Sequence, residues 1–152
     1  MPPHAHSGRA HLSKGLLPQA QQLANQNIAA FKDLITPETP LIGIEPSAIL
    51  SFRDEYPKLA SPQNRDAAKL IAPNALLIEE FIWNEAQKGN IVPDAFTKQT
   101  QQITLHGHCH QKALSSVDYS AWVLSLPQNY SVQVIPSGCC GMAGSFGYEA
   151  EH

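Results

Sequence analysis

All three cysteines of this 152-residue chain lie in two short segments that are rich in histidine and glycine. Cys109 belongs to a His-Gly-His-Cys-His run, and Cys139 and Cys140 are neighbours in a Pro-Ser-Gly-Cys-Cys-Gly run. Soft transition metals and iron–sulfur clusters favour thiolate and imidazole ligands. We therefore predict a metal centre, with an iron–sulfur cluster as the cofactor and with the ligands Cys109, Cys139, Cys140 and His108.

The segment around Cys109 contains three alternating histidines, His106, His108 and His110. In an extended chain their side chains share one face, and Cys109 lies on the other. Two such histidines together with the paired cysteines would form a zinc site of mixed nitrogen and sulfur ligands. The competing interpretation is that these histidines hydrogen-bond to loop carbonyls and only hold the turn.

Gly138 and Gly141 flank the paired cysteines and are candidate cofactor-binding residues. Glycines let the backbone pass close to a cluster and direct amide groups at its sulfur atoms, which favours an anionic group. Two other interpretations of the cysteines stay open. Either they are small buried side chains, as free cysteines often are, or the neighbouring pair performs dithiol chemistry, although no base lies nearby in sequence.

The composition is that of a globular domain. The chain is 43% hydrophobic and 15% charged, with a formal net charge of −3. That charge provides no basic surface, so nucleic acid is not an expected partner. No apolar run reaches the ~18 residues of a membrane span, and the first residues lack a secretory signal pattern. An odd number of cysteines, two of them adjacent, argues against a disulfide framework and favours a reducing cytoplasm.

Hydrophobic spacing and the positions of proline predict alternating helices and strands. The expected helices are 17–35, 47–56, 64–71, 75–88 and 110–124, and the expected strands are 41–44, 102–106 and 131–135. This alternation indicates an α/β fold with a small parallel sheet of about three to four strands and flanking helices. The segments that follow the strands then meet at the carboxyl ends of the sheet, where α/β proteins place their sites.

We expect residues 1–12 to form a flexible N-terminal segment and residues 13–152 to form a single cysteine-rich α/β domain. A weak internal similarity also suggests two degenerate half-repeats, 7–60 and 100–152. A sheet of so few strands leaves an uncovered edge, which favours association of two copies of the chain.

A charged group follows the first strand. We interpret Arg53 and its neighbours Asp54 and Glu55 as a solvated helix surface. The alternative is that Glu45 pairs with Arg53 or lies beside the metal centre.

Three motifs together resemble a known family. They are His-Gly-His-Cys-His-Gln-Lys-Ala-Leu, Cys-Cys-Gly-Met-Ala-Gly-Ser-Phe-Gly-Tyr-Glu and Gly-Ile-Glu-Pro-Ser, within residues 8–151. They are similar to the cysteine-rich (CCG) domain of iron–sulfur subunits of glycolate and D-lactate oxidases and of FAD-linked 2-hydroxyacid oxidoreductases. That domain is related to one of the subunits of heterodisulfide reductase.

The resemblance implies electron transfer through a 4Fe-4S cluster, with Cys109, Cys139 and Cys140 as family ligands. It also implies a flavin-containing dehydrogenase subunit or domain as partner. FAD would be bound only on that partner, so the chain would be part of an oxidoreductase and not catalytic on its own. A membrane-associated redox partner is compatible with the same resemblance.

The chain departs from the family pattern at three places. Ala48 and the run His6-Ser7-Gly8 stand where the family has cysteines, and the chain stops at His152, before a further cysteine segment of the family. An ordinary four-iron cluster has four thiolate ligands. The cluster would therefore be labile, or completed by a histidine, an exogenous ligand or another chain. The alternative function is a degenerate docking module without redox activity, or a zinc-binding structural domain.

Overall fold

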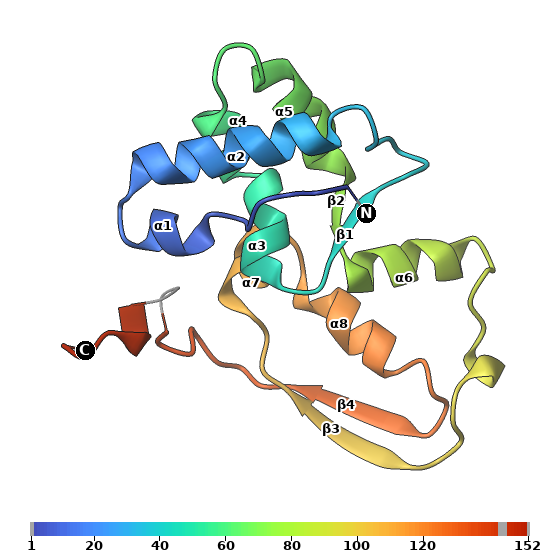
Figure 1. Ribbon diagram of the computed structural model, residues 1–152. Helices are drawn as coiled ribbons and strands as arrows, with labels where there is room; N and C mark the ends of the chain where they lie inside the picture. Colours follow the sequence, from blue (N-terminus) through green and yellow to red (C-terminus); the bar gives the residue numbers. More distant parts are fainter. Residues whose placement is uncertain (1, 143–145, 152) are drawn as a thin grey trace.

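The computed structural model describes residues 2–142 and 146–151 (Figure 1). These residues form a mixed α/β structure in which two pairs of parallel strands are flanked by helices. The predicted fold class, a small α/β domain with parallel strands, is confirmed. The four strands of the described residues do not form one sheet, however, but two sheets of two strands each. None of the helices in the described residues is both long enough and apolar enough to cross a membrane.

The first sheet pairs β1 (Leu41–Gly43) with β2 (Ala75–Leu77), in a register that places Leu41 opposite Ala75. Two helices precede it, and α6 (Ile78–Gln87) and η3 (Pro93–Ala95) follow it. The preceding helices are α1 (Arg9–Ser13) and α2 (Leu17–Phe31). The connection from β1 to β2 contains five short helices, which are α3 (Pro46–Ile49), η1 (Leu50–Phe52), α4 (Glu55–Leu59), α5 (Arg65–Ile71) and η2 (Ala72–Asn74).

The second sheet pairs β3 (Gln101–Leu105) with β4 (Tyr130–Val134) along all five residues. The crossover between them contains α7 (Cys109–Leu114) and α8 (Val117–Leu124), and η4 (Phe146–Tyr148) follows β4. In Figure 1 this sheet lies below α8, away from the first sheet and from α2.

Several predicted boundaries are wrong, and local capping explains them. Residues 75–77 form β2 instead of the first turn of a helix, because they pair with β1 and because the Glu80 carboxylate accepts the Leu77 N–H at 2.8 Å, which starts α6 at residue 78. The helix expected over 110–124 is divided, because the Ser116 hydroxyl accepts the Asp118 N–H at 3.1 Å and starts a new helix.

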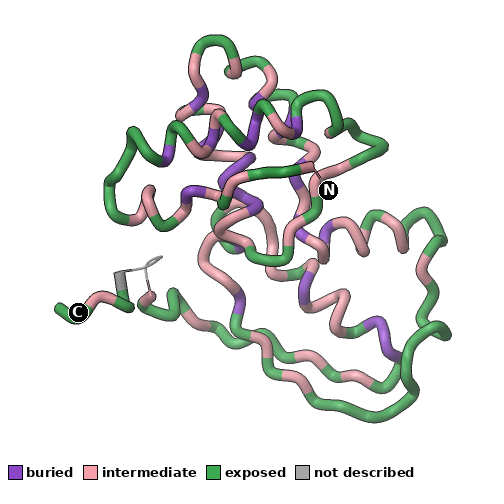
Figure 2. Tube along the Cα trace, viewed as in Figure 1, coloured by how far each residue is buried: buried purple, intermediate pink, exposed green. Residues whose placement is uncertain are grey.

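The main hydrophobic core belongs to the first half of the chain. Its buried members come from α2, from the segment between β1 and β2, and from β2 itself, where Figure 2 shows most of the buried segments. They are Ala24, Ile28, Phe31, Ile49, Leu50, Phe52, Tyr56, Ala60, Ala68, Ile71, Ala75 and Leu77. None of the ten residues of strands β3 and β4 is fully buried. Helix α8 packs on α6 through Trp122 and Trp83, whose ring centroids are 4.9 Å apart.

The N-terminal segment contains the helix α1, in part of the region where we expected a loop. Residues just before α1 are hydrogen-bonded to the core. The buried Asn27 side chain accepts the Ala5 N–H at 2.9 Å, and the Tyr56 hydroxyl donates to the Ser7 carbonyl at 2.9 Å. Asn27 Nδ2 in turn donates to the Tyr56 hydroxyl at 2.9 Å.

We expect Tyr56→Phe to lower the free energy of unfolding by about 1–2 kcal/mol, because it leaves the Ser7 carbonyl and one Asn27 donor without their partner. Chemical denaturation monitored by circular dichroism measures this. Tyr130→Phe, at a residue outside this network, is the control. Equal stability of wild type and Tyr56→Phe would contradict the assignment.

Candidate metal centre

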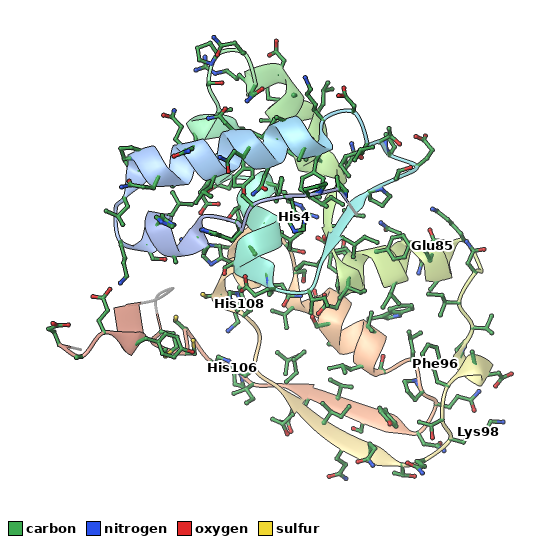
Figure 3. The ribbon with its side chains drawn as sticks, in the orientation of Figure 1. His4, Glu85, Phe96, Lys98, His106 and His108 are labelled. Atoms are coloured by element: carbon green, nitrogen blue, oxygen red, sulfur yellow. The ribbon has the colours of Figure 1, made fainter. Side chains whose placement is uncertain are left out.

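The parallel pairing of β3 and β4 brings the two cysteine segments to the same edge of their sheet. Cys109 is the first residue of α7, which follows β3, and Cys139 and Cys140 follow β4. In Figure 3 the labelled His106 and His108 lie on the segment that leaves β3, on the side that faces the chain after β4. The candidate ligands therefore lie at the carboxyl ends of these two strands.

Cys109 and Cys139 are in contact. Their side chains are within hydrogen-bonding reach of each other, and all three cysteines are free of disulfides. Burial raises the pKa of the Cys109 thiol, and the adjacent Cys139 raises it further. Two thiolates side by side repel each other, and a bound metal cation removes that repulsion.

The segment after β4 supplies amide donors as well as thiols. The Gly141 N–H donates to Cys139 Sγ at 3.4 Å, and Gly141 has a φ of 86°, which a glycine adopts without strain. Gly138 has open space where a Cβ would be, so packing does not require a glycine there. Cys140 is exposed next to Cys139.

Lys112 fastens this segment to α7. Its Nζ donates to the Ser137 carbonyl at 2.6 Å and to the Gly138 carbonyl at 3.0 Å. Lys112 lies three residues after Cys109 and so on the same face of α7. It therefore holds the second cysteine segment against the first and places a positive charge beside the thiols. Sequence reasoning missed this role, although the spacing of three residues was a signal for it.

His108 caps α7. Its Nδ1 accepts the His110 N–H at 3.1 Å, and its Nε2 lies 3.7 Å from Glu45 Oε1. Glu45 is itself occupied as the cap of α3, where it accepts the N–H groups of Ser47 at 3.0 Å and Ala48 at 2.6 Å. His108 thus has a structural role at the turn, in line with one of the two interpretations of the histidines.

His110 faces the other half of the molecule. Its Nε2 lies 3.9 Å from Glu55 Oε1 in α4, and Glu55 forms an ion pair with Arg9 in α1. Burial lowers the pKa of His110, and the nearby Arg9 charge lowers it further. One ligand atom from each of His108, Cys109 and His110 lies within 4.8 Å of the others, close enough to hold one metal ion. His106 is exposed and is not part of this group.

The expectation of a solvated charged surface around Arg53 is wrong for two of its residues. Arg53 forms a bidentate ion pair with the buried Glu80 of α6, and Glu55 pairs with Arg9. These partners lie 27 and 46 residues away, so no local pattern indicates them. Arg53 does not pair with Glu45.

Gly107 is required for the close approach of the cysteine turn to α8. A Cβ on Gly107 would lie 2.4 Å from Val117 Cγ2. We expect Gly107→Ala to lower the free energy of unfolding by about 1–3 kcal/mol, because the branched valine side chain is stiff. Thermal or chemical unfolding measures this. Val117→Ala in the same chain should restore much of the loss, whereas Gly138→Ala should change stability little.

The donor set fits a soft metal or an iron–sulfur cluster. Such a group needs thiolate or imidazole ligands and donors that stabilise its charge. The described residues provide two thiols in contact, an amide directed at one of them, two histidines within reach and a lysine charge. The ligand roles of Cys109, Cys139, Cys140 and His108 stay predictions.

The chain is similar to segments of larger dehydrogenases. It is 25% identical over 151 residues to D-2-hydroxyglutarate dehydrogenase of Escherichia coli strain K12 and 26% identical over 151 residues to that of Haemophilus influenzae. In both cases the match covers 99% of this chain and 14% of the relative. It is 22% identical over 142 residues to a subunit of the anaerobic glycerol-3-phosphate dehydrogenase of Escherichia coli strain K12, covering 93% of this chain and 34% of that protein.

No protein-family model matches the sequence, and no solved structure matches it significantly. The chain thus spans about a seventh to a third of the length of these curated relatives.

Proposed function

We propose that this chain is the cysteine-rich (CCG) electron-transfer domain of a flavin-linked 2-hydroxyacid oxidoreductase and that it binds an iron–sulfur cluster. The contact between Cys109 and Cys139, which are thirty residues apart, is the observation that carries the proposal. The similarity to two kinds of dehydrogenase, over nearly the whole chain, supports the redox context.

The residues have distinct roles in this proposal. Cys109, Cys139 and the exposed Cys140 hold the iron as thiolates. The Gly141 amide hydrogen-bonds to the Cys139 sulfur, which stabilises its negative charge, and the Lys112 ammonium balances the charge of an anionic group. When bound, the cluster accepts and passes on single electrons.

The flavin and the hydroxyacid substrate belong to a partner protein or domain in this proposal. The curated relatives are much longer than this chain, so most of their length has no counterpart here. None of the three cysteines forms a disulfide, which suits a reducing compartment, and we propose the cytoplasm on that ground.

Anaerobic reconstitution with iron and sulfide tests the proposal. We expect bound iron and sulfide, and an electron paramagnetic resonance signal on reduction. A control iron–sulfur protein is loaded in parallel. Absence of iron in this chain under conditions that load the control would overturn the proposal, and zinc without iron in freshly purified protein would indicate a structural site instead.

A further inference from the structure

The histidine run poses a choice that the geometry resolves. His108 and His110 both have a ring nitrogen close to Cys109. Their surroundings differ, because the His108 ring accepts a hydrogen bond from the turn, whereas the His110 ring faces a carboxylate on a different helix.

His108 is poorly placed to bind a metal. A lone pair on its Nδ1 accepts the His110 N–H at 3.1 Å, so that nitrogen carries no proton, and the proton of the neutral ring is on Nε2. Binding through Nδ1 would break the cap of α7. Binding through Nε2 would require the ring to give up the proton that faces Glu45, 3.7 Å away.

Neither ring nitrogen of His110 forms a hydrogen bond in the described part of the chain, whereas Nδ1 of His108 does. A ligating histidine usually donates its other ring N–H to a carboxylate, which fixes the ring and its tautomer. Glu55 is the carboxylate that faces this ring, with Oε1 3.9 Å from His110 Nε2, so a small ring rotation would bring the two into hydrogen-bonding distance. The second Glu55 oxygen is buried with no hydrogen-bond partner in the described part of the chain. The Arg9 ion pair holds the Glu55 carboxylate in place. With Nε2 turned toward Glu55, Nδ1 would be the nitrogen that binds the metal.

We propose that His110, oriented by the Arg9–Glu55 ion pair, is the nitrogen ligand of the metal centre in place of His108. This inference rests on the metal centre of the proposed function and names its fourth ligand beside the cysteine sulfurs. Glu55 is then a positioning residue that acts through His110. It links α1 and α4 of the first half of the chain to a site that is otherwise built from the second half.

Titration of the full chain with Co²⁺ alone, under anaerobic conditions, tests the assignment. Binding is followed by the absorption bands of thiolate-bound Co²⁺. We expect His110→Ala to weaken Co²⁺ binding about 10–100-fold, and His106→Ala, in the same loop, to leave it unchanged. The assignment would be overturned if His110→Ala lost less Co²⁺ affinity than His108→Ala, or lost none. It would also be overturned if the wild-type chain did not bind Co²⁺.

Glu55 is tested by a double-mutant cycle. Glu55→Gln should weaken Co²⁺ binding about tenfold in the wild-type background and have no effect in the His110→Ala background, since it acts through that ring. An equal effect in both backgrounds would show that Glu55 only stabilises the fold. Glu38→Gln, at a remote exposed residue, is the control.

The iron-loaded protein gives a second, independent readout. With ¹⁵N-labelled histidine, electron spin echo spectra of the reduced cluster should show coupling to a histidine nitrogen that disappears in His110→Ala. A cluster without such coupling would overturn the histidine assignment while leaving the proposed function intact. If the chain binds Co²⁺ through His110 but takes up no cluster, the proposed function is overturned and the histidine assignment stands.

Discussion

Cys109→Ser is expected to reduce the iron content of the reconstituted protein by more than about tenfold. Removing an outer-shell partner of a metal site already costs 10–100-fold in affinity, and Cys109 is proposed as a direct ligand. Cys109 is also the cysteine of α7 that contacts Cys139, so its replacement removes the thiol pair. Iron and acid-labile sulfide analysis after anaerobic reconstitution measures the loss.

Two variants complete this experiment. Cys139→Ser should lose iron to the same extent, because its sulfur contacts Cys109. Ser137→Ala changes the same segment without removing a sulfur and should keep its iron. Full iron loading of Cys109→Ser, with the same paramagnetic signal as wild type, would show that the thiol pair is not part of the centre.

Arg53→Met is expected to lower the free energy of unfolding by about 3–5 kcal/mol at pH 7, because it leaves the buried Glu80 carboxylate without its cation. In the native protein Arg53 Nε donates to the Ala75 carbonyl at 2.7 Å, and its guanidinium binds both Glu80 oxygens. The Ser115 hydroxyl also donates to Glu80 at 2.6 Å. The ion pair therefore joins η1, β2, α6 and the end of α7.

The loss should depend on pH. Burial raises the pKa of Glu80, but the hydrogen bonds from Arg53, Ser115 and Leu77 outweigh it, so the pKa is lowered overall. A lowered pKa in the folded state stabilises the fold above the unfolded-state pKa of about 4.3, and this contribution is lost as the pH falls through the folded-state value. The difference between wild type and Arg53→Met should therefore shrink below pH ~4.

Urea denaturation at pH 7 and at acidic pH measures both effects. Arg53→Met with Glu80→Gln is the matched control, since glutamine removes the unpaired buried charge while its amide oxygen can still accept the Leu77 N–H. Equal destabilisation by the single and double variants would mean that the arginine acts through packing and not through its charge.

The position of the thiols could be predicted from the sequence because it follows from topology. Cys109 and Cys139 each come shortly after a strand, and parallel neighbouring strands end at the same edge. The strands β3 and β4 are also five residues long, which is long enough for a strand pattern to be recognised in the sequence. Strand β2 has only three residues, Ala75–Leu77, and these are good helix formers, so its pairing with β1 decides its conformation and its sequence does not.

The capping role of His108 could not be predicted, because it depends on where the helix begins, to within one residue. A helix that began at His110 or Gln111 would leave His108 in the loop. The observed start at Cys109 makes His108 the cap instead. Such boundaries are uncertain by a residue or two in any sequence pattern. The Arg53–Glu80 and Arg9–Glu55 pairs join distant segments and likewise leave no local trace.

The uneven distribution of the core has a consequence for how the molecule opens. Residues of the main core lie between Ala24 and Leu77, whereas the sheet that positions the cysteines has no fully buried residue. Cooperative units with few buried contacts open at lower free energy than the rest of a protein. The β3–β4 unit should therefore unfold locally while α2 and α5 stay protected. In the metal-loaded state that we propose, a chelator would then make residues 101–142 the first target of a protease, and the loss of metal would precede global unfolding.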